Sequence, residues 1–243
     1  MSSGTNSGKE QILESLRRSR GRKGPIDAET AAMLRARIDR HARNIVPART
    51  DLDAVGLVDL FETMATKAHT SVARVADMAD VPRAVSDYLR GENLPSEVVM
   101  APDPSLDAAP WSDNALLDIR RGVPGEPDQV SITSAPHAVA ETGTLAMFSG
   151  PHHPSTLNFV PETHVVVLPA SRIVKSYEDV WDSVREQADD PGSGRDGLPP
   201  RTVNFVTGPS RSGDIEQTLL LGAHGPRRLH IVIIEDGVGC GRR

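Results

Sequence analysis

Aromatic side chains are scarce in this sequence, at 3% of 243 residues, and there is a single cysteine, Cys240. With so few aromatic rings, the hydrophobic core has to be built from Val, Leu, Ile, Ala and Met. One cysteine cannot form an internal disulfide, ligate an iron–sulfur cluster or make a zinc site of the cysteine type. We therefore expect no metal or cofactor bound by this chain, and a reducing compartment, the cytoplasm.

Long apolar runs are also missing. No stretch approaches the ~20 residues that a membrane-spanning helix needs. The polar first segment, Met-Ser-Ser-Gly-Thr-Asn-Ser-Gly, lacks the apolar region of a signal peptide. These absences predict a soluble protein that has no membrane span and is not exported. The length is enough for one large domain or two small ones, with ample core.

Charge is unevenly distributed along the chain. Residues 1–50 carry 11 Lys and Arg against 5 Asp and Glu, a net charge of +6, whereas residues 51–243 carry 16 against 28, a net charge of −12. The basic segment has no interleaved aromatic residues and no DNA-binding motif, so we expect no nucleic acid as a partner. A basic arm that folds onto its own acidic body or onto an acidic partner explains the asymmetry better. Whether the chain forms a homo-oligomer stays open.

The apolar pattern separates a helical, partly disordered N-terminal arm, residues 1–50, from an α/β domain, residues 51–243. In the arm we expect helices over 9–20 and 27–43, the second capped by Asp27. In the domain, strand patterns alternate with helical ones, which predicts a mostly parallel sheet covered on both faces. Its helices are expected at 55–67, 81–89 and 176–186, and its strands at 71–75, 97–100, 116–119, 130–133, 143–148, 164–168, from 203 onward and 229–234.

A donor-rich turn follows the strand that begins at Val203. Asp214 stands three residues before Gln217, the spacing of a capping box, which predicts a strand, a turn and a helix start. Such turns bind anions in open α/β sheets, and Arg211 could add a bidentate contact. The alternative is a tight connection whose glycines only satisfy backbone geometry. The candidate ligand-binding residues here are Gly208, Ser210, Arg211, Ser212, Asp214 and Glu216.

Two known motifs do not fit this turn. No Gly-Lys-Ser/Thr follows the strand, so it is not a Walker loop. Ser212 occupies the place of the second glycine of Gly-x-Ser-x-Gly, so it is not a nucleophile elbow.

A second candidate lies upstream, where Glu141 stands in a small-residue turn before an apolar strand. Glu141 could act as a base or nucleophile, or bind a hydroxyl or amine together with Thr142, Gly143 and Thr144. The alternative is a turn carboxylate that caps neighbouring N–H groups.

A third candidate is the pair His224-Gly225. The imidazole can titrate near neutral pH, although most loop histidines have no catalytic task. His152 and His153 are adjacent, and adjacent residues rarely converge on one metal ion, so we expect no metal site there.

These candidates lead to a prediction about position. If their loops follow parallel strands, they share the edge formed by the strands' carboxyl ends. The Glu141 turn and the turn after Val206 should then approach each other, with Arg211 facing Glu141, Glu216 or a small anionic ligand.

Four segments together resemble a known family. They are Ala-Glu-Thr-Gly-Thr-Leu (140–145), Val-Val-Val-Leu (165–168), Gly-Pro-Ser-Arg-Ser-Gly-Asp-Ile-Glu-Gln-Thr (208–218) and Leu-Gly-Ala-His-Gly-Pro (221–226). In this order they resemble the LUD domain of the lactate-utilisation protein C family, over about residues 52–236. The family often has Thr-Ala where this chain has Ser212-Gly213.

The resemblance implies a fold and a pathway. The fold would be the three-layer α/β/α type of the NagB/RpiA/CoA transferase-like proteins. The family acts with two iron–sulfur proteins that oxidise L-lactate to pyruvate, so this chain would be the cluster-free component, with the clusters only in its partners. The alternatives are an enzyme that binds a small carboxylate, phosphate or CoA-type ligand, and a ligand-responsive regulatory protein.

Overall fold

The computed structural model describes residues 5–21, 26–189, 199–215 and 218–237, in two compact units, Met1–Asn44 and Ile45–Arg243. The first unit holds α1 (Thr5–Ser19) and α2 (Ala28–Asp39). Asp27 caps α2 as expected, because its Oδ1 accepts a 2.7 Å hydrogen bond from the Thr30 N–H. The helix ends four residues before the expected Arg43, and His41 beyond it has a positive φ of 46°.

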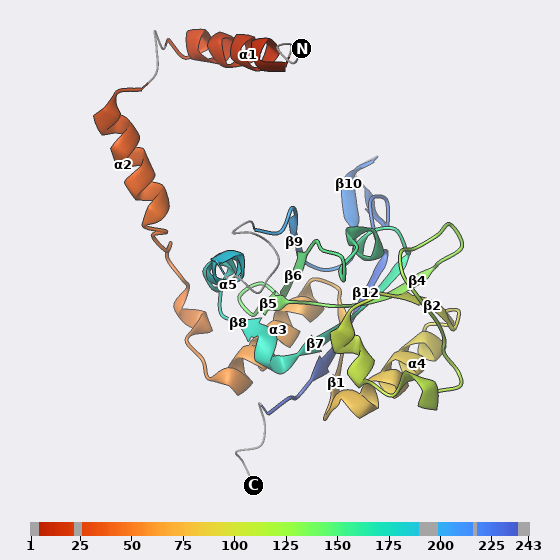
Figure 1. Ribbon diagram of the computed structural model, residues 1–243. Helices are drawn as coiled ribbons and strands as arrows, with labels where there is room; N and C mark the ends of the chain where they lie inside the picture. The colour runs from red at the N-terminus through yellow and green to blue at the C-terminus, as the bar shows by residue number, and fades with distance from the viewer. Residues whose placement is uncertain (1–4, 22–25, 190–198, 216–217, 238–243) are drawn as a thin grey trace. The chain divides into compact units, whose positions relative to one another are not determined.

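A six-stranded sheet, all parallel, forms the centre of the second unit (Figure 1). The strand that contains the Val-Val-Val-Leu run is buried along nearly its whole length, and a strand covered on both faces of a sheet has such a continuous apolar run. The strand order is β1 (Ser71–Val75), β12 (Arg228–Ile234), β7 (Thr163–Pro169), β4 (Val130–Ser134), β2 (Glu97–Met100) and β3 (Asp118–Arg121).

The third strand of the chain begins two residues later than expected. Leu116 and Leu117 belong to a turn in which the Leu116 N–H donates to Asn114 Oδ1 and the Leu117 N–H donates to the Asn114 carbonyl. The turn uses these N–H groups, so pairing with β2 starts only at Asp118.

A second, mixed sheet was not predicted. It contains β8 (Ile173–Val174), β5 (His137–Val139), β6 (Thr144–Phe148) and β9 (Val203–Val206), in that order. β6 pairs antiparallel with both β5 and β9. The turn between β5 and β6 has only four residues, too few for the crossover that parallel strands need. The segments at 143–148 and 203–206 are therefore strands as expected, but they lie outside the parallel sheet.

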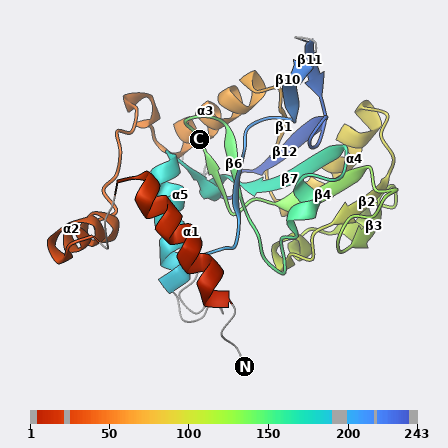
Figure 2. The same ribbon diagram turned by 90° about the horizontal axis from the view of Figure 1, so that it is seen from above.

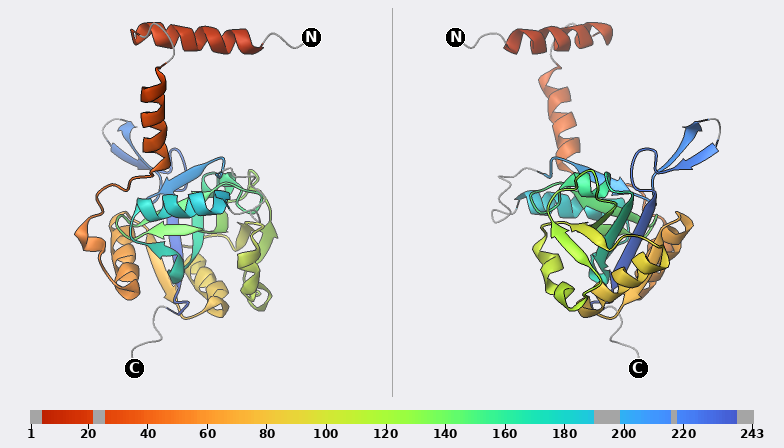
Figure 3. Two further views of the ribbon diagram at one scale, coloured as in Figure 1. Left: turned by 60° about the vertical axis from the view of Figure 1, so that its left-hand side comes forward. Right: turned by 90° about the vertical axis from the view of Figure 1, so that its right-hand side faces the viewer.

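The predicted helix start at Asp214 is wrong. Arg211–Ile215 is strand β10, which pairs antiparallel with β11 (Thr218–Leu221) (Figure 3). The ladder pairs Arg211 with Leu221 and Ser212 with Leu220, so the backbone groups that a helix would use are bonded across a hairpin. Gln217, the other half of the expected capping box, lies outside the described residues.

Helices cover the faces of the two sheets (Figure 2). α4 (Val81–Gly91) packs on one face of the parallel sheet, with Val81, Val85 and Leu89 in its core. The other face packs on α3 (Ala54–Lys67) and on the second sheet, in a core around Phe61. α5 (Tyr177–Asp189) covers the far face of the second sheet. The parallel sheet is thus covered on both faces, as predicted, but one face is covered partly by α3 and partly by the second sheet.

Single-turn helices occur in the connections, at Ala48–Thr50, Met78–Asp80, Pro104–Ala108, Trp111–Asp113, Ser155–Asn158 and Ala170–Arg172. None of the helices in the described ranges has both the length and the apolar character required to cross a membrane.

Candidate functional site

The turn before β6, which contains Glu141, and the turn after β9 lie side by side, and we call them the two motif turns. The reason for their approach differs from the predicted one. β6 and β9 are antiparallel neighbours with Leu145 opposite Val206, so the turn before β6 lies beside the turn after β9. The hydroxyl oxygens of Thr144 and Thr207 are 2.7 Å apart. The approach is thus made by antiparallel pairing in the second sheet and not by a shared edge of parallel strands.

Glycines in both turns allow close packing on the end of α3. Gly143 and Gly208 have positive φ angles of 66° and 75°. A Cβ at Gly143 would lie 2.2 Å from the backbone nitrogen of Ala65, and one at Gly208 would lie 2.1 Å from the carbonyl oxygen of Ala68. Only glycine combines this conformation with this approach. Backbone geometry and close packing are therefore enough to explain the two glycines.

A cluster of hydroxyl groups joins the same turns to α5. Thr142 Oγ1 lies 2.6 Å from Thr144 Oγ1, and the Tyr177 hydroxyl lies 2.9 Å from both. Thr144 is fully buried. These hydroxyls bond to one another, which assigns Thr142 and Thr144 a structural task in this conformation.

Glu141 pairs with Arg49, at 3.4 Å, and not with Arg211. Among the described residues, Arg211 has no ion pair with a carboxylate, whereas Glu216 lies outside them. Of the three alternatives expected to face Arg211, Glu141 is therefore not the one observed, because its side chain pairs with Arg49 in the segment that precedes α3.

A pocket of about 290 Å³ lies between the turn after β9 and the loop that contains His224 and Gly225. We call it the His164 pocket. It includes Gly208, Ser210, Arg211, His224 and Gly225 of the predicted site, but not the Glu141 turn. Ser212 and Asp214 belong to strand β10. The pocket is lined by Asn158, Phe159, His164, Phe205, Val206, Thr207, Gly208, Pro209, Ser210, Arg211, His224, Gly225, Pro226 and Leu229.

The position of the pocket also differs from the prediction. His164 and Leu229 are the second residues of β7 and β12, so the pocket lies at the amino-terminal end of the parallel sheet. The predicted edge was the carboxyl-terminal one. The prediction failed because β9, which leads into the motif, does not belong to the parallel sheet.

Ser210 fastens the two loops that form one wall of the pocket. Its N–H donates to the Pro226 carbonyl at 2.8 Å, and its carbonyl accepts from the Gly222 N–H at 3.0 Å. Its hydroxyl accepts from the His224 N–H at 3.3 Å. These bonds explain why Gly-Pro-Ser and His-Gly-Pro occur together in the sequence, because each loop satisfies the other's backbone.

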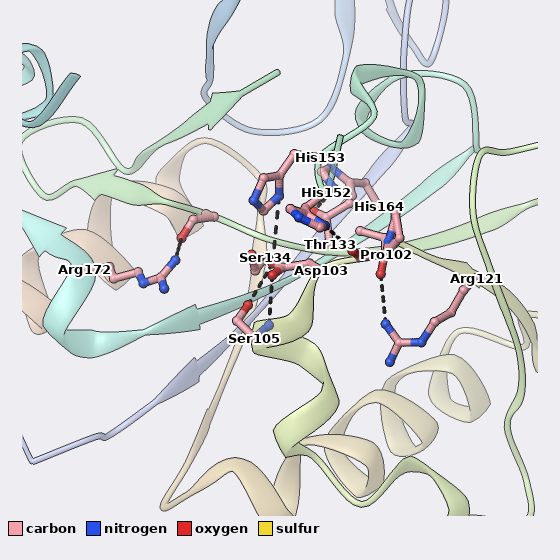
Figure 4. A network of polar contacts seen from close by, with 12 residues as sticks. Pro102, Asp103, Ser105, Arg121, Thr133, Ser134, His152, His153, His164 and Arg172 are labelled. Carbon is pink, nitrogen blue, oxygen red and sulfur yellow. Dashed lines mark hydrogen bonds and ion pairs between the residues drawn. The ribbon is translucent and has the colours of Figure 1, made fainter. Parts of the chain in front are cut away.

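His164 is the pocket residue that sequence reasoning missed. It is fully buried, and its Nε2 lies 2.8 Å from Thr133 Oγ1 (Figure 4). Its Nδ1 is buried and has no hydrogen-bond partner among the described residues. Burial lowers the pKa of His164 to about 3, so the imidazole is neutral. The available signal was a polar residue at the start of a continuously apolar strand.

Comparison with known proteins finds a LUD domain within the second unit. Residues 128–234 match the model of the LUD domain. The chain carries a LUD domain. Lactate utilization protein C of Exiguobacterium sp. is 29% identical over 188 residues, 74% of this chain and 78% of that protein. The one from Bacillus velezensis is 26% identical over 201 residues, 81% and 76% of the two chains, and the one from Geobacillus sp. is 32% identical over 136 residues, 56% and 53%.

A solved structure shares the fold of this chain. It is the crystal structure of a DUF162 family protein from Deinococcus radiodurans, with a TM-score of 0.55 and 21% identity, covering 76% of this chain and 99% of that one. The chain is thus a distant homologue of lactate utilization protein C over most of its length, with an α/β fold found in a solved relative.

A second polar cluster lies at the carboxyl ends of β2 and β4 in the parallel sheet. Asp103, which follows β2, accepts bonds from the Ser105 N–H at 2.9 Å, from the Ser105 hydroxyl at 2.8 Å and from the Ser134 hydroxyl (Figure 4). Burial raises the pKa of Asp103, but these hydrogen bonds outweigh it and leave the pKa below its ordinary value. His153 Nδ1 is 3.9 Å from the carboxylate. The carboxylate is therefore anionic and satisfied.

Neither cluster is arranged for a metal ion. Within the described ranges, no three His, Cys, Asp or Glu side chains converge as metal ligands would. His152, beside His153, has its Nδ1 2.8 Å from the Pro102 carbonyl oxygen.

Proposed function

We propose that this chain is the cluster-free component of an L-lactate utilisation system, acting in the cytoplasm with iron–sulfur partner proteins, and that its His164 pocket binds a small anionic ligand. The relatives named lactate utilization protein C support the pathway. The single cysteine supports placing the clusters in the partners. We assign the fold to the three-layer NagB/RpiA/CoA transferase-like type on the same resemblance.

The observation that carries the ligand site is Arg211 at the wall of the His164 pocket. Its side chain is exposed, and no carboxylate of the described residues pairs with it. A guanidinium with this freedom can form a bidentate pair with a carboxylate or phosphate. The volume of about 290 Å³ lies at the small end of ligand pockets, which favours a ligand of few heavy atoms.

Binding of small acids to the full chain tests the site. L-lactate, pyruvate and inorganic phosphate are titrated by calorimetry into the wild-type protein, Arg211→Ala and Arg227→Ala. Arg227 is a matched control, since it is exposed and pairs with Glu162 at 3.7 Å but does not line the pocket. We expect Arg211→Ala to lose at least about tenfold in affinity, because a charge-assisted contact contributes about 1.5–3 kcal/mol. Equal loss in both variants would point to general charge and would contradict the site.

The pathway is tested separately from the ligand. Affinity purification of the tagged chain from lactate-grown cells should recover iron–sulfur proteins, and deletion of its gene should impair growth on L-lactate. Normal growth of the deletion strain and no iron–sulfur partner would overturn the assignment. Turnover of an acid by the isolated chain would instead identify an enzyme. Binding with a shape change and no turnover would identify a regulatory protein.

A further inference from the structure

The edge strand β1 has backbone groups that point away from its sheet. β1 is the last strand on one side of the parallel sheet, and its pairing partner is β12. The Val75 carbonyl accepts from the Glu235 N–H at 3.0 Å, so Val75 bonds toward β12. Successive residues of a strand bond to opposite sides, so the N–H and carbonyl groups of Val72, Arg74 and Ala76 point away from β12. Among the described residues, no second strand and no turn forms a backbone hydrogen bond with these groups.

The other edge of the same sheet is protected against strand addition. In β3, three of the four residues are charged, namely Asp118, Arg120 and Arg121. The Arg120 guanidinium also donates to the Val123 carbonyl at 3.2 Å. Charged side chains on an edge strand disfavour pairing with another chain. β1 has a single charged residue, Arg74, so its edge is the more open of the two.

A pocket of about 430 Å³ lies along this open edge, between β1 and α4. Residues 73–76 form one wall, and Ala84 and Tyr88 of α4 belong to the other. Tyr88 stacks on His230, with the ring centroids 3.8 Å apart, which holds the tyrosine ring in place. The volume is within the range of ligand sites, and no residue that lines this pocket also lines the His164 pocket. We call it the β1–α4 groove.

Side chains of β1 alternate between the two faces of the sheet, and the two faces differ in charge. Val75 packs against the core that contains α4, whereas Arg74 reaches α3. The guanidinium pairs with Asp59 at 2.7 Å, with Glu62 at 2.5 Å and with Glu235 at 3.7 Å. Three carboxylates around one guanidinium leave a net charge of −2 on the α3 side of the edge.

The groove side of the edge is balanced in charge and partly apolar. Asp87 pairs with Arg83 at 3.8 Å and with Arg90 at 2.6 Å. Asp80 lines the groove and has no ion pair among the described residues, so two carboxylates offset two guanidinium groups. Ala84 adds apolar surface to the same wall. An extended segment along β1 thus meets an acidic surface on one face and a neutral groove on the other.

We propose that the edge of β1 binds an extended segment of a partner protein in which apolar and basic side chains alternate. The backbone of this segment pairs with the outward groups of Val72, Arg74 and Ala76, as an added strand. Its apolar side chains enter the β1–α4 groove, and its basic side chains lie beside Asp59 and Glu62. The excess of carboxylates selects this pattern, because opposite charges on neighbouring strands attract and like charges repel. The inference does not depend on the proposed function, since the groove and the His164 pocket are separate.

Synthetic peptides test this surface on the full-length protein. The probe is an eight-residue peptide that alternates Val and Lys, and its binding is followed by fluorescence polarisation. Two altered peptides, one with Glu in place of Lys and one N-methylated at its four central residues, should each bind at least about tenfold more weakly. N-methylation removes backbone donors and leaves the side chains unchanged. In spectra of ¹⁵N-labelled protein, the amide signals of Arg74 and Ala76 should shift on binding of the Val/Lys peptide, and those of β3 should not.

Protein variants separate the backbone contribution from the charge. Ala76→Pro removes an outward N–H at an exposed residue and should weaken binding of the Val/Lys peptide about fivefold. Glu62→Gln removes one carboxylate and should weaken it about two- to fivefold. Glu97→Gln, at the exposed first residue of β2, makes the same charge change elsewhere and should have no effect. If Ala76→Pro does not fold, the N-methylated peptide makes the same test on the unaltered chain.

Each contrary outcome is decisive. Absence of binding by the Val/Lys peptide, or equal binding of its N-methylated form, overturns the added strand. Equal binding of the Val/Lys and Val/Glu peptides, or an equal loss in Glu62→Gln and Glu97→Gln, overturns the choice of a basic segment. A dimer in sedimentation equilibrium that Ala76→Pro abolishes assigns the edge to a second copy of this chain and overturns the partner segment.

Discussion

Thr144 and Thr207 hold the two motif turns together through a 2.7 Å contact between their hydroxyl oxygens. Thr144 is buried and also bonds to Tyr177 of α5. Replacing Thr144 removes its contacts with Thr142, Tyr177 and Thr207, whereas replacing Thr207 removes only the contact that the two threonines share.

We therefore expect Thr144→Val to lower the free energy of unfolding by about 1–3 kcal/mol, or roughly 2–12 °C in melting temperature for a chain of this size. The double variant with Thr207→Val should lose less than the sum of the single losses. Ser112→Ala, at an exposed site, is the control. Strictly additive losses would show that the two hydroxyls act independently.

Gly143 and Gly208 should tolerate no side chain. Each has a positive φ and lies against the backbone of α3, so alanine combines conformational strain with a backbone clash. We expect each Gly→Ala change to cost at least about 2 kcal/mol, measured by urea unfolding.

Two other glycines separate the causes of that loss. Gly150 has open space around the Cβ position and an ordinary φ, so alanine there should be nearly neutral. Gly237 has open space and a positive φ of 85°, so alanine there reports the strain alone. A Gly143→Ala loss no larger than that of Gly237→Ala would show that α3 moves aside.

Stability should fall as the pH is lowered below about 6.5. Burial lowers the pKa of His164 to about 3 and that of His230 to about 4, from an ordinary 6.5. Between these values the unfolded chain binds protons that the folded chain does not, so stability is present above pH 6.5 and is lost on acidification. Each histidine should contribute roughly 1.4 kcal/mol per pH unit within its window.

Urea midpoints at pH 7.5, 6 and 5 measure this slope. His230→Phe retains the ring stacked on Tyr88, at a centroid separation of 3.8 Å, and should flatten the slope between pH 6.5 and 4. An unchanged slope in both His230→Phe and His164→Phe would show that these two histidines do not cause the acid sensitivity.

Deleting residues 1–24 should leave the α/β unit folded. Residues 1–44 form a compact unit of their own, and α2 contains no buried residue. We expect the melting temperature to change by less than about 10 °C. Phe61→Ala, in the core, should lower the free energy of unfolding by about 3–5 kcal/mol, and it serves as the comparison for loss of a core side chain. A larger fall for the truncated chain would make the arm part of the core.

The purified chain should be colourless and should not oxidise lactate alone. A single cysteine cannot ligate a cluster, which needs several cysteine ligands. Ultraviolet–visible spectra and a dye-reduction assay with L-lactate check this. Lactate-dependent dye reduction by flavin-free protein would contradict the cluster-free role.

Sequence patterns predicted the long elements well and the short ones poorly. β7 and β12 begin and end within one residue of the expected bounds, because strands buried on both faces have continuous apolar runs. β5 and β8 have three and two residues, too short for any periodicity to show. The capping-box spacing predicts a helix start where the β10–β11 hairpin lies, because that spacing is a local signal, whereas strand pairing depends on residues farther along the chain.

The candidate site was predicted in part. Arg211, Ser210 and His224 were singled out by their small and polar neighbours, and they do meet in one pocket. His164 could not be found this way, because its role depends on which strand end lies beneath the motif. That position is set by the second sheet, whose existence the sequence pattern did not indicate.

The end of α3 fixes the positions of the two turns that contain Gly143 and Gly208. Gly143 and Gly208 both rest on the backbone of residues 64–68, and Arg211 follows Gly208 by only three residues. Adding one residue to a helix advances its end by about 1.5 Å and rotates it by about 100°. A single-residue insertion in α3 would thus displace both turns from their seats and disturb the pocket wall without altering any residue that lines it.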